Sequence, residues 1–302
     1  MAKCKPPDNS IRNRRTPKTP WERYPFEVLG PSCFAQQAYC EKQVELWLDD
    51  PGKLVSIPKR IEGNTPAAIL RQEVVDLGTQ FHHSASEHAQ SVARSQILAR
   101  LDADESMALL ETAFSGAYGN LPLVGVPDVV CFRGRDAACV IEYKVTDSNQ
   151  LHRNHRVQLL LYGYLLEQES FGVHELALVC ALIPRAYAAR VHSFTDRQAN
   201  EMIAIIHTAA KELITAAPSR QDWYQSNVRI HQDLSIRLRV FKYDRQRAER
   251  ELQFFSKFWL GRRPAKPTTK PSKCRACLYN ACSLCPAALV PYAGAQSERR
   301  VG

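Results

Sequence analysis

Two acids and one lysine, in two neighbouring apolar stretches, are the residues best suited to chemistry. Asp128 lies in "VPDVV", and Glu142 and Lys144 lie in "IEYK". Each acid is seven residues from Arg135, so a hairpin centred there would set the two acids opposite each other, with Cβ atoms about 4.5–5.5 Å apart. Facing carboxylates repel unless a cation lies near them, and Mg²⁺ prefers such oxygen ligands. We therefore expect a metal-binding site here.

Lys144 should share one face of its strand with Glu142, because alternate side chains of a strand point to opposite faces. An ammonium group beside a metal ion can orient or help deprotonate water and can stabilise charge that develops on a phosphate. The alternative is a solvated salt bridge on an edge hairpin, which is common for E-x-K triplets. The apolar setting "ACVIEYKV" makes a casual charge less favourable.

A histidine is a further candidate ligand. "LGTQFHH" lies in a long amphipathic helix, or two helices in series, predicted over residues 65–101. Small or apolar residues surround His82 on this helix, whereas polar residues surround His83, so His82 should point inward. Gly78, one turn earlier, would permit a close approach. The alternative for His82 is a core histidine that is bonded to a backbone carbonyl.

Gln158 and Tyr162 are four residues apart in "QLLLY", so both should project from one side of a helix just after the proposed catalytic strand. Gln158 could hold the lysine or a nucleotide. Tyr162 could contact a phosphate or a base. The pattern by itself is common in proteins.

Ten cysteines occur in the chain, and four of them fall within "KCRACLYNACSLC". Because the N-terminus lacks the apolar core of a signal peptide, we expect an intracellular protein, in which cysteines favour metal or redox chemistry over disulfides. The compartment would be the nucleus or mitochondrion of a eukaryote, and otherwise the cytoplasm. No apolar run is long enough for a membrane span.

The order of the elements predicts an α/β fold. Apolar patterns predict strands over 123–132, 137–145 and 175–184, and helices over 33–48, 155–169 and 196–214. Cys40 falls inside the first of these helices. The formal net charge of +9 favours a polyanionic partner.

The series G-x-x-x-H, P-D, E-x-K and Q-x-x-x-Y resembles the RecB-like branch of the PD-(D/E)XK nuclease superfamily. This resemblance implies a restriction-endonuclease-like core, in which helices flank a central mixed sheet, and phosphodiester hydrolysis with Mg²⁺ or Mn²⁺. It implies that His82, Asp128 and Glu142 are metal ligands, together with the Tyr143 carbonyl. It also implies that Lys144 is the catalytic lysine and that Gln158 and Tyr162 support Lys144 and the DNA.

The segments "YCEKQVE" and "FFSKFWLGRR" are most similar to the exonuclease V family, an iron–sulfur subset with one cysteine before the nuclease core and three after it. The resemblance implies a 4Fe-4S cluster held by Cys40, Cys274, Cys277 and Cys282, with Cys285 as the alternative fourth ligand. The usual C-x2-C-x5-C spacing is absent, because four or seven residues follow Cys277. Such a cluster would join the N-terminal helix to the C-terminus. A zinc knuckle of the four C-terminal cysteines is the alternative.

These inferences predict a basic disordered leader (1–30), a nuclease domain (31–270), an iron–sulfur segment (271–290) and a tail (291–302). The expected protein is a monomeric single-stranded DNA exonuclease in DNA repair or genome maintenance, with a single-strand-binding protein as a further candidate partner. Alternatives are a CRISPR-associated iron–sulfur nuclease and a non-enzymatic zinc-knuckle DNA-binding protein. The candidate DNA contacts are Arg153, Arg156, Arg237, Arg239 and Lys242.

Overall fold

A computed structural model describes residues 28–49, 94–192, 194–216, 223–231, 234–275, 277–281 and 285–289. The chain divides into two compact units. We call residues 28–35 and the described part of 94–252 the sheet unit, and residues 36–49 and the described part of 253–289 the terminal unit. Helices α1 (Pro31–Tyr39) and α9 (Arg245–Trp259) contribute residues to both units.

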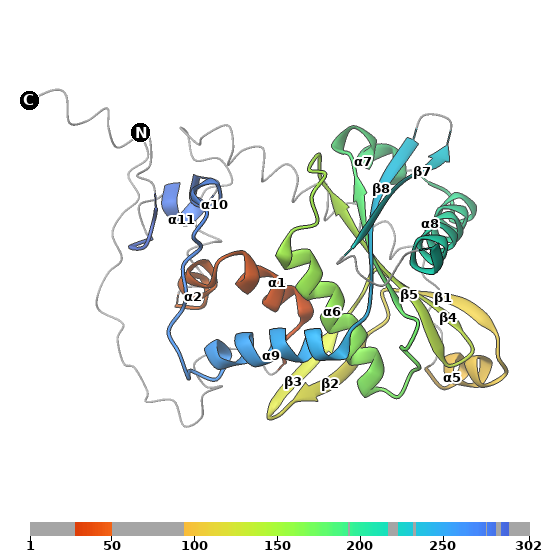
Figure 1. Ribbon diagram of the computed structural model, residues 1–302, viewed down its shortest axis with the longest axis horizontal. Helices are drawn as coiled ribbons and strands as arrows, with labels where there is room; N and C mark the ends of the chain where they lie inside the picture. The colour runs from red at the N-terminus through yellow and green to blue at the C-terminus, as the bar shows by residue number, and fades with distance from the viewer. Residues whose placement is uncertain are drawn as a thin grey trace, which may run out of the picture. The chain divides into compact units, whose positions relative to one another are not determined.

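A six-stranded mixed sheet forms the centre of the sheet unit (Figure 1). Its strands, in spatial order, are β1 (Ser106–Leu110), β4 (Val129–Arg133), β5 (Asp136–Val145), β6 (Ala177–Ile183), β8 (Leu234–Lys242) and β7 (Tyr224–His231). Only the β5–β6 pair is parallel. A separate hairpin consists of β2 (Phe114–Tyr118) and β3 (Leu121–Gly125). The predicted α/β class with a central mixed sheet is therefore confirmed.

The β4–β5 hairpin pairs the strands as the sequence predicted, although its turn differs. Gly134 adopts a positive φ of 53° in a two-residue turn, and the register shifts once at Cys131 and Phe132. After this β-bulge, Val129 pairs with Ile141, so the next residue of β4's N-terminal end, Asp128, comes to the level of Glu142. An extra bulged residue thus replaces the symmetric turn centred on Arg135 that we expected.

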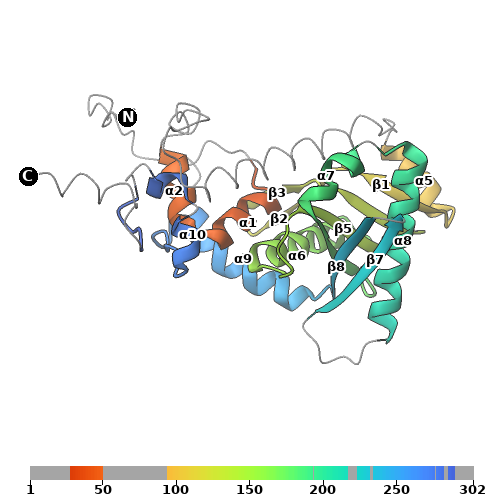
Figure 2. The same cartoon turned by 90° about the horizontal axis from the view of Figure 1, so that it is seen from above.

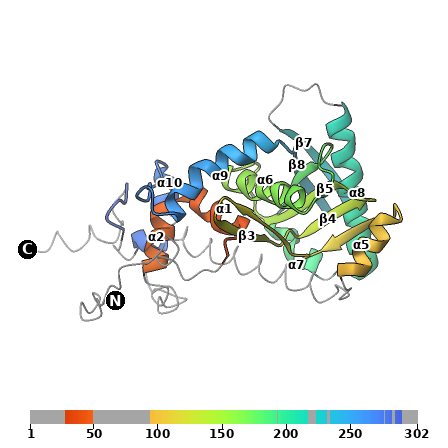
Figure 3. The same ribbon diagram turned by 90° about the horizontal axis from the view of Figure 1, so that it is seen from below.

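Helices cover both faces of the sheet, as Figures 2 and 3 show for α6 (Arg153–Gln168) and α8 (Asp196–Ala216). The α8 face carries the main apolar core, which includes Ile141 and Tyr143 of β5 together with Ile206 of α8. Glu142 and Lys144 alternate with these residues and point to the α6 face. The predicted division of β5 into two faces is confirmed.

Helix α6 is buried along most of its length, from Val157 to Leu166. Its approach to the rest of the unit depends on Gly163, because a Cβ at this position would lie 2.4 Å from the Tyr243 ring. Larger residues would push the helix away from Tyr243. The close contact at Gly163 therefore helps to fix the position of α6, which carries Gln158 and Tyr162.

The terminal unit contains α2 (Glu41–Asp49), the end of α9, α10 (Pro271–Arg275) and α11 (Leu278–Ala281). The helix predicted over 33–48 is in fact two helices, and Cys40 lies between them rather than inside one. Its amide still donates to Gln36 O at 3.0 Å, and its carbonyl still accepts from Gln43 and Val44. Apolar periodicity continues through this break, which is why the sequence did not reveal it.

The short helices α5 (Arg94–Asp102) and α7 (Arg185–His192) complete the described elements. Helix α5 is the end of the long helix predicted over 65–101, most of which lies outside the described residues. Among the described residues, no helix is long and apolar enough to cross a membrane. Strands β1, β2, β7 and β8 were not predicted from the sequence.

Candidate functional site

Glu142 and Lys144 form an ion pair on the α6 face of β5. Lys144 Nζ donates to Glu142 Oε1 at 2.6 Å. Glu142 is 2% exposed, whereas the Lys144 side chain is 26% exposed. Since β5 lies between β4 and β6, the alternative of a solvated pair on an edge hairpin is wrong. The ion pair is partly buried inside the sheet unit and reaches solvent through the lysine.

Asp128 lies beside this pair, just before β4. Its Oδ2 accepts a hydrogen bond from the Tyr143 amide at 2.6 Å. Burial lowers the pKa of Lys144, but the nearby Glu142 and Asp128 carboxylates outweigh burial and raise the pKa above its usual value. The lysine is therefore an ammonium group at neutral pH.

Gln158 and Tyr162 approach Glu142 from α6, as their helical spacing predicted. Gln158 Nε2 donates to Glu142 Oε1 at 2.6 Å and to the Tyr162 hydroxyl at 3.0 Å. The Tyr162 hydroxyl in turn donates to Val126 O at 3.1 Å. Burial, followed by the charges of Glu142 and Asp128, raises the Tyr162 pKa well above its usual value. The tyrosine is thus an interior link between α6 and the segment before Asp128.

Each of these groups has a chemical capacity that suits a divalent cation. Asp128, Glu142 and the Tyr143 carbonyl are hard oxygen donors, which is the ligand type that Mg²⁺ and Mn²⁺ take. Lys144 supplies one positive charge against two neighbouring carboxylates. A further cation would reduce the repulsion between these carboxylates, so the donor set fits the expected metal.

The third predicted ligand, His82, lies outside the described residues. Among the residues that are described, no three His, Cys, Asp or Glu side chains are grouped so that they could hold one metal ion. Of the three side chains predicted to bind the metal, Asp128 and Glu142 are described and His82 is not.

Two arginines of β8 hold the loop that follows β5. Arg239 is 4% exposed, and its Nε donates to Asn149 O at 2.9 Å. Arg237 Nη2 donates to Thr146 O at 2.8 Å. These guanidinium groups bind the chain's own carbonyls and so fix the connection between Lys144 and α6. That Arg237 and Arg239 contact DNA remains a prediction.

The other three predicted DNA contacts differ in whether they form an ion pair with a carboxylate. Arg153 pairs with Glu251 at 2.7 Å, and Lys242 pairs with Glu175 at 2.8 Å. Arg156 forms no ion pair with a carboxylate in the described part of the chain. The alternation R-x-R in an apolar strand was the sequence signal that could have identified the inward-facing role of the β8 arginines.

A neutral histidine lies on the same face of the sheet and was not singled out from the sequence. His155 Nδ1 lies 3.9 Å from Cys180 Sγ, and Cys180 pairs with Glu142 in the β5–β6 register. Burial, then the charges of Lys144 and His152, lowers the His155 pKa to about 3. Burial raises the pKa of the Cys180 thiol to about 12. Both groups are therefore uncharged neighbours of the ion pair.

The terminal unit gathers cysteines in one pocket. Its lining includes Cys40, Cys274, Cys277 and Cys285, whereas Cys282 lies outside the described residues. Burial raises the pKa of Cys285, and the neighbouring Cys40 and Cys274 thiols raise it further. Four sulfur donors suit soft metals and iron–sulfur clusters, but among the described residues these thiols are not grouped in the way that one metal ion requires.

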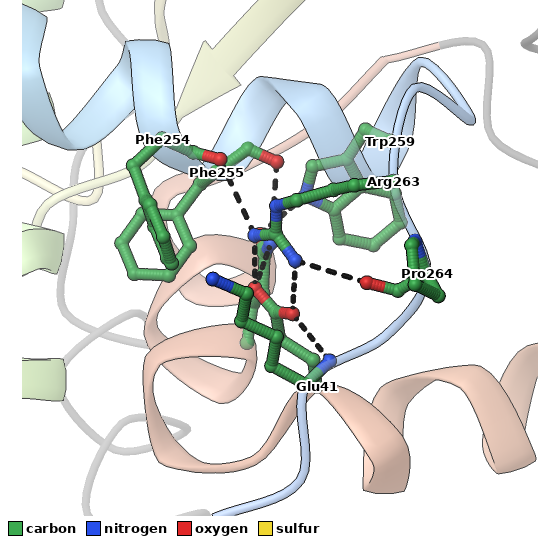
Figure 4. Close-up of polar contacts among 8 residues, drawn as sticks. Glu41, Phe254, Phe255, Trp259, Arg263 and Pro264 are labelled. Atoms are coloured by element: carbon green, nitrogen blue, oxygen red, sulfur yellow. Dashed lines mark hydrogen bonds and ion pairs between the residues drawn. The ribbon is translucent and has the colours of Figure 1, made fainter.

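Glu41, the residue that follows Cys40, forms a buried ion pair with Arg263 (Figure 4). Both Glu41 oxygens accept bonds from the Arg263 guanidinium, and Oε2 also accepts from the Lys266 amide at 2.7 Å. Gln37 donates to Glu41 at 2.8 Å and accepts from Trp259 Nε1 at 2.7 Å. The network joins the residue after Cys40 to the segment that leads to Cys274. The sequence analysis missed it.

Residues 61–286 match the PD-(D/E)XK nuclease superfamily. No curated protein matches the chain. The matched range contains His82 and the whole of the site on β5 and α6, as well as the four C-terminal cysteines.

Proposed function

Because the chain belongs to the PD-(D/E)XK nuclease superfamily, whose members are metal-dependent nucleases, we propose that the sheet unit hydrolyses phosphodiester bonds at Asp128, Glu142 and Lys144. The observation that carries this proposal is the cluster of these three side chains, with Lys144 Nζ 2.6 Å from Glu142 Oε1. Asp128 and Glu142 would hold the metal, with His82 and the Tyr143 carbonyl as further ligands. The metal would supply a Lewis acid and a more acidic bound water.

The residues around the proposed metal have two roles: Lys144 would contact the phosphate, and the others hold the two carboxylates in place. Lys144 is charged, so it would donate hydrogen bonds to a phosphate oxygen and stabilise the negative charge of the transition state. The Tyr143 amide holds Asp128, and Gln158 holds Glu142. Because these holders belong to β5 and α6, the carboxylates are preorganised by regular structure rather than by a loose loop.

At finer detail, we assign the activity to a single-stranded DNA exonuclease that acts in DNA repair or genome maintenance. The net charge of +9 and the resemblance of "YCEKQVE" and "FFSKFWLGRR" to the exonuclease V family support this assignment. The domain boundaries predicted from the sequence are part of the same proposal.

We assign an iron–sulfur cluster to the cysteine pocket of the terminal unit. The presence of Cys40, Cys274, Cys277 and Cys285 in one pocket supports the assignment. Cys282, the fourth ligand that the sequence favours, lies outside the described residues, so Cys282 and Cys285 both remain candidates. When bound, the cluster would link the two ends of the terminal unit by covalent iron–thiolate bonds. The Glu41–Arg263 ion pair would hold the pocket's two halves near each other.

The nuclease proposal is tested with Lys144→Ala and single strands blocked at either the 5′ or the 3′ end, in the presence of Mg²⁺. We expect cleavage to fall by about 10³-fold or more, because a charged transition-state contact is lost. Binding measured in EDTA should persist. Lys211→Ala is the matched control, since this exposed lysine lies on α8, which packs on the face of the sheet opposite Glu142 and Lys144. Normal cleavage by Lys144→Ala would refute the proposal.

Duplex DNA and RNA of the same sequence complete the nuclease test. Faster cleavage of single-stranded DNA from one end supports the finer assignment. Cleavage of duplexes at internal positions would replace the exonuclease by an endonuclease, while the superfamily chemistry would stand.

The cluster proposal is tested by iron and sulfide content after anaerobic purification of Cys285→Ser and Cys282→Ser. We expect the variant that removes the fourth ligand to lose most iron and the brown colour, and the other variant to keep both. A colourless wild-type protein that contains zinc would reject the cluster. Loss of iron in Cys282→Ser alone would assign the fourth ligand to Cys282.

A further inference from the structure

A basic segment of the terminal unit has no acids of its own. Between Glu251 and Glu298 the 46 intervening residues contain no Asp or Glu. The same stretch contains seven cationic residues: Lys257, Arg262, Arg263, Lys266, Lys270, Lys273 and Arg275. We call residues 257–275 the basic segment. Its local charge differs strongly from that of the rest of the chain, where acids and bases are interspersed.

Two of the seven cations have structural tasks. Arg263 binds the Glu41 carboxylate, and Lys273 Nζ donates to Tyr39 O at 2.9 Å. The remaining five are exposed: Lys257, Arg262, Lys266, Lys270 and Arg275. Within the described ranges, no carboxylate forms an ion pair with any of these five. Exposed arginines of the sheet unit differ, since Arg100, Arg197 and Arg245 each pair with a glutamate.

The basic segment is held in shape at several points. Pro264, Pro267 and Pro271 each remove a backbone torsional freedom. The Lys266 amide is bonded to Glu41 at 2.7 Å, and Lys273 is bonded to Tyr39 O. The positive charges are therefore presented from a constrained backbone, which lowers the entropy that a ligand must remove on binding.

We propose that the basic segment binds the phosphate backbone of the nucleic acid that the protein cleaves. This proposal rests on the nuclease function proposed above and assigns part of the substrate affinity to the terminal unit. Surface cations that have no carboxylate partner gain most from a polyanion, because each contact with a phosphate releases condensed counterions.

Nucleic acid fits this surface better than a protein partner does. Stable protein interfaces are anchored by buried apolar or aromatic side chains. In the described part of the terminal unit, Leu289 is the one large apolar side chain that is markedly exposed. Charge without an apolar anchor is typical of contacts to a phosphate backbone.

The test neutralises Lys257, Arg262, Lys266 and Lys270 together by substitution with Gln in the full-length protein. The probe is a fluorescent single-stranded oligonucleotide of about 30 nucleotides, titrated in EDTA so that it is not cleaved. The control neutralises four exposed cations of the sheet unit, namely Arg100, Arg133, Arg197 and Lys211, and so has the same net charge as the test variant.

Four lost phosphate contacts should reduce the salt slope of log K by about 2.8 for a single strand. Between 50 and 200 mM salt, the wild type should then lose about 50-fold more affinity than the test variant. The control variant should keep nearly the wild-type slope. At saturating substrate with Mg²⁺, the test variant should keep its kcat, because Lys144 and the carboxylates are unchanged.

Equal salt slopes for the test and control variants would overturn the inference, and would leave the nuclease proposal intact if Lys144→Ala still abolishes cleavage. A folded test variant with normal iron content but no change in affinity would also overturn it. Thermal unfolding monitored by circular dichroism shows whether the variant is folded. Failure of the nuclease proposal would appear separately, as normal cleavage by Lys144→Ala.

Discussion

Two buried glutamates, one in each unit, have opposite kinds of surroundings. In the terminal unit, Glu41 is 3% exposed and both of its oxygens accept bonds from Arg263. In the sheet unit, Glu142 is 2% exposed, and the bonds from Lys144 and Gln158 both end on Oε1. Arg263 is itself largely buried, whereas Lys144 is partly open to solvent.

The difference between the two sites distinguishes a structural ion pair from one that we propose to be reactive. Around Glu41 a bidentate arginine and a backbone amide match the carboxylate, so a buried charge is compensated by fixed donors. Around Glu142 lies a second carboxylate, that of Asp128, and both carboxylates act on the Lys144 charge. The first arrangement stabilises a fold, and the second is suited to a metal and a phosphate.

The largest expected difference between the Glu142 and Glu41 sites is the effect of a substitution on catalysis. Glu142→Gln should lower cleavage by about 10³-fold or more, which corresponds to about 4 kcal/mol in the transition state. The free energy of unfolding should fall less than in Glu41→Gln, because Lys144 loses its counter-charge but reaches solvent, and the substitution removes a repulsion with Asp128. Cleavage rates and urea unfolding measure the two quantities. A large loss of stability with normal cleavage would make Glu142 a structural residue like Glu41.

The next effect is on the stability of the terminal unit. Glu41→Gln leaves the Arg263 charge buried without its counter-charge, which should cost about 3–5 kcal/mol. Hydrogen exchange of residues 36–49 and 253–275 should then accelerate, while exchange in β5 and β6 stays slow.

The double variant Glu41→Leu with Arg263→Met serves as the control for the terminal unit. It removes both charges and should recover much of the lost stability. If exchange in the double variant is as fast as in Glu41→Gln, the ion pair is not the source of the protection. Uniform acceleration over both units would show that the two sites do not differ as described.

The smallest expected effect is the loss of stability of the sheet unit when the pH is lowered. The folded-state pKa of His155 is about 3, below its usual value of about 6.5, so the unfolded state binds the proton first as pH falls. The resulting stability is present above pH 6.5 and is lost between pH 6.5 and pH 3. Lowering the pH from 7.5 to 5.5 should cost at most about 1.4 kcal/mol through this group.

Urea unfolding of the wild type and of His155→Asn at the two pH values measures the pH effect. Asn keeps a polar group near Cys180 but does not titrate, so the variant should lose less stability on acidification. The charged or titratable neighbours Lys144, His152 and Cys180 are common to both proteins. Identical losses in both proteins would contradict a depressed His155 pKa.

The elements that carry the proposed chemistry could be predicted because their patterns are local. Alternation in 137–145 placed Glu142 and Lys144 on one face, and a helical spacing of four placed Gln158 beside Tyr162. The pairing of Asp128 with Glu142 was also predicted, although the turn and the β-bulge that produce it were not. His82 and Cys282 remain predictions, since both lie outside the described residues.

The missed features depend on contacts between distant parts of the chain. Arg237 and Arg239 were expected at the surface, but the loop after β5 receives their hydrogen bonds across about 90 residues of sequence. Glu41 and Arg263 are separated by 222 residues. No periodicity in either segment indicates which partner it will find.

The sequence by itself determined which side chains share a face of a strand or helix, because strand and helix geometry repeats over two to four residues. It also determined the acid-free stretch, residues 252–297, which contains the four C-terminal cysteines. Only the tertiary structure decided that β5 is an interior strand, that Cys285 shares a pocket with Cys40, and that Glu41 is matched by an arginine. These outcomes depend on the order of strands in the sheet and on close packing, which bring together residues that no local pattern connects.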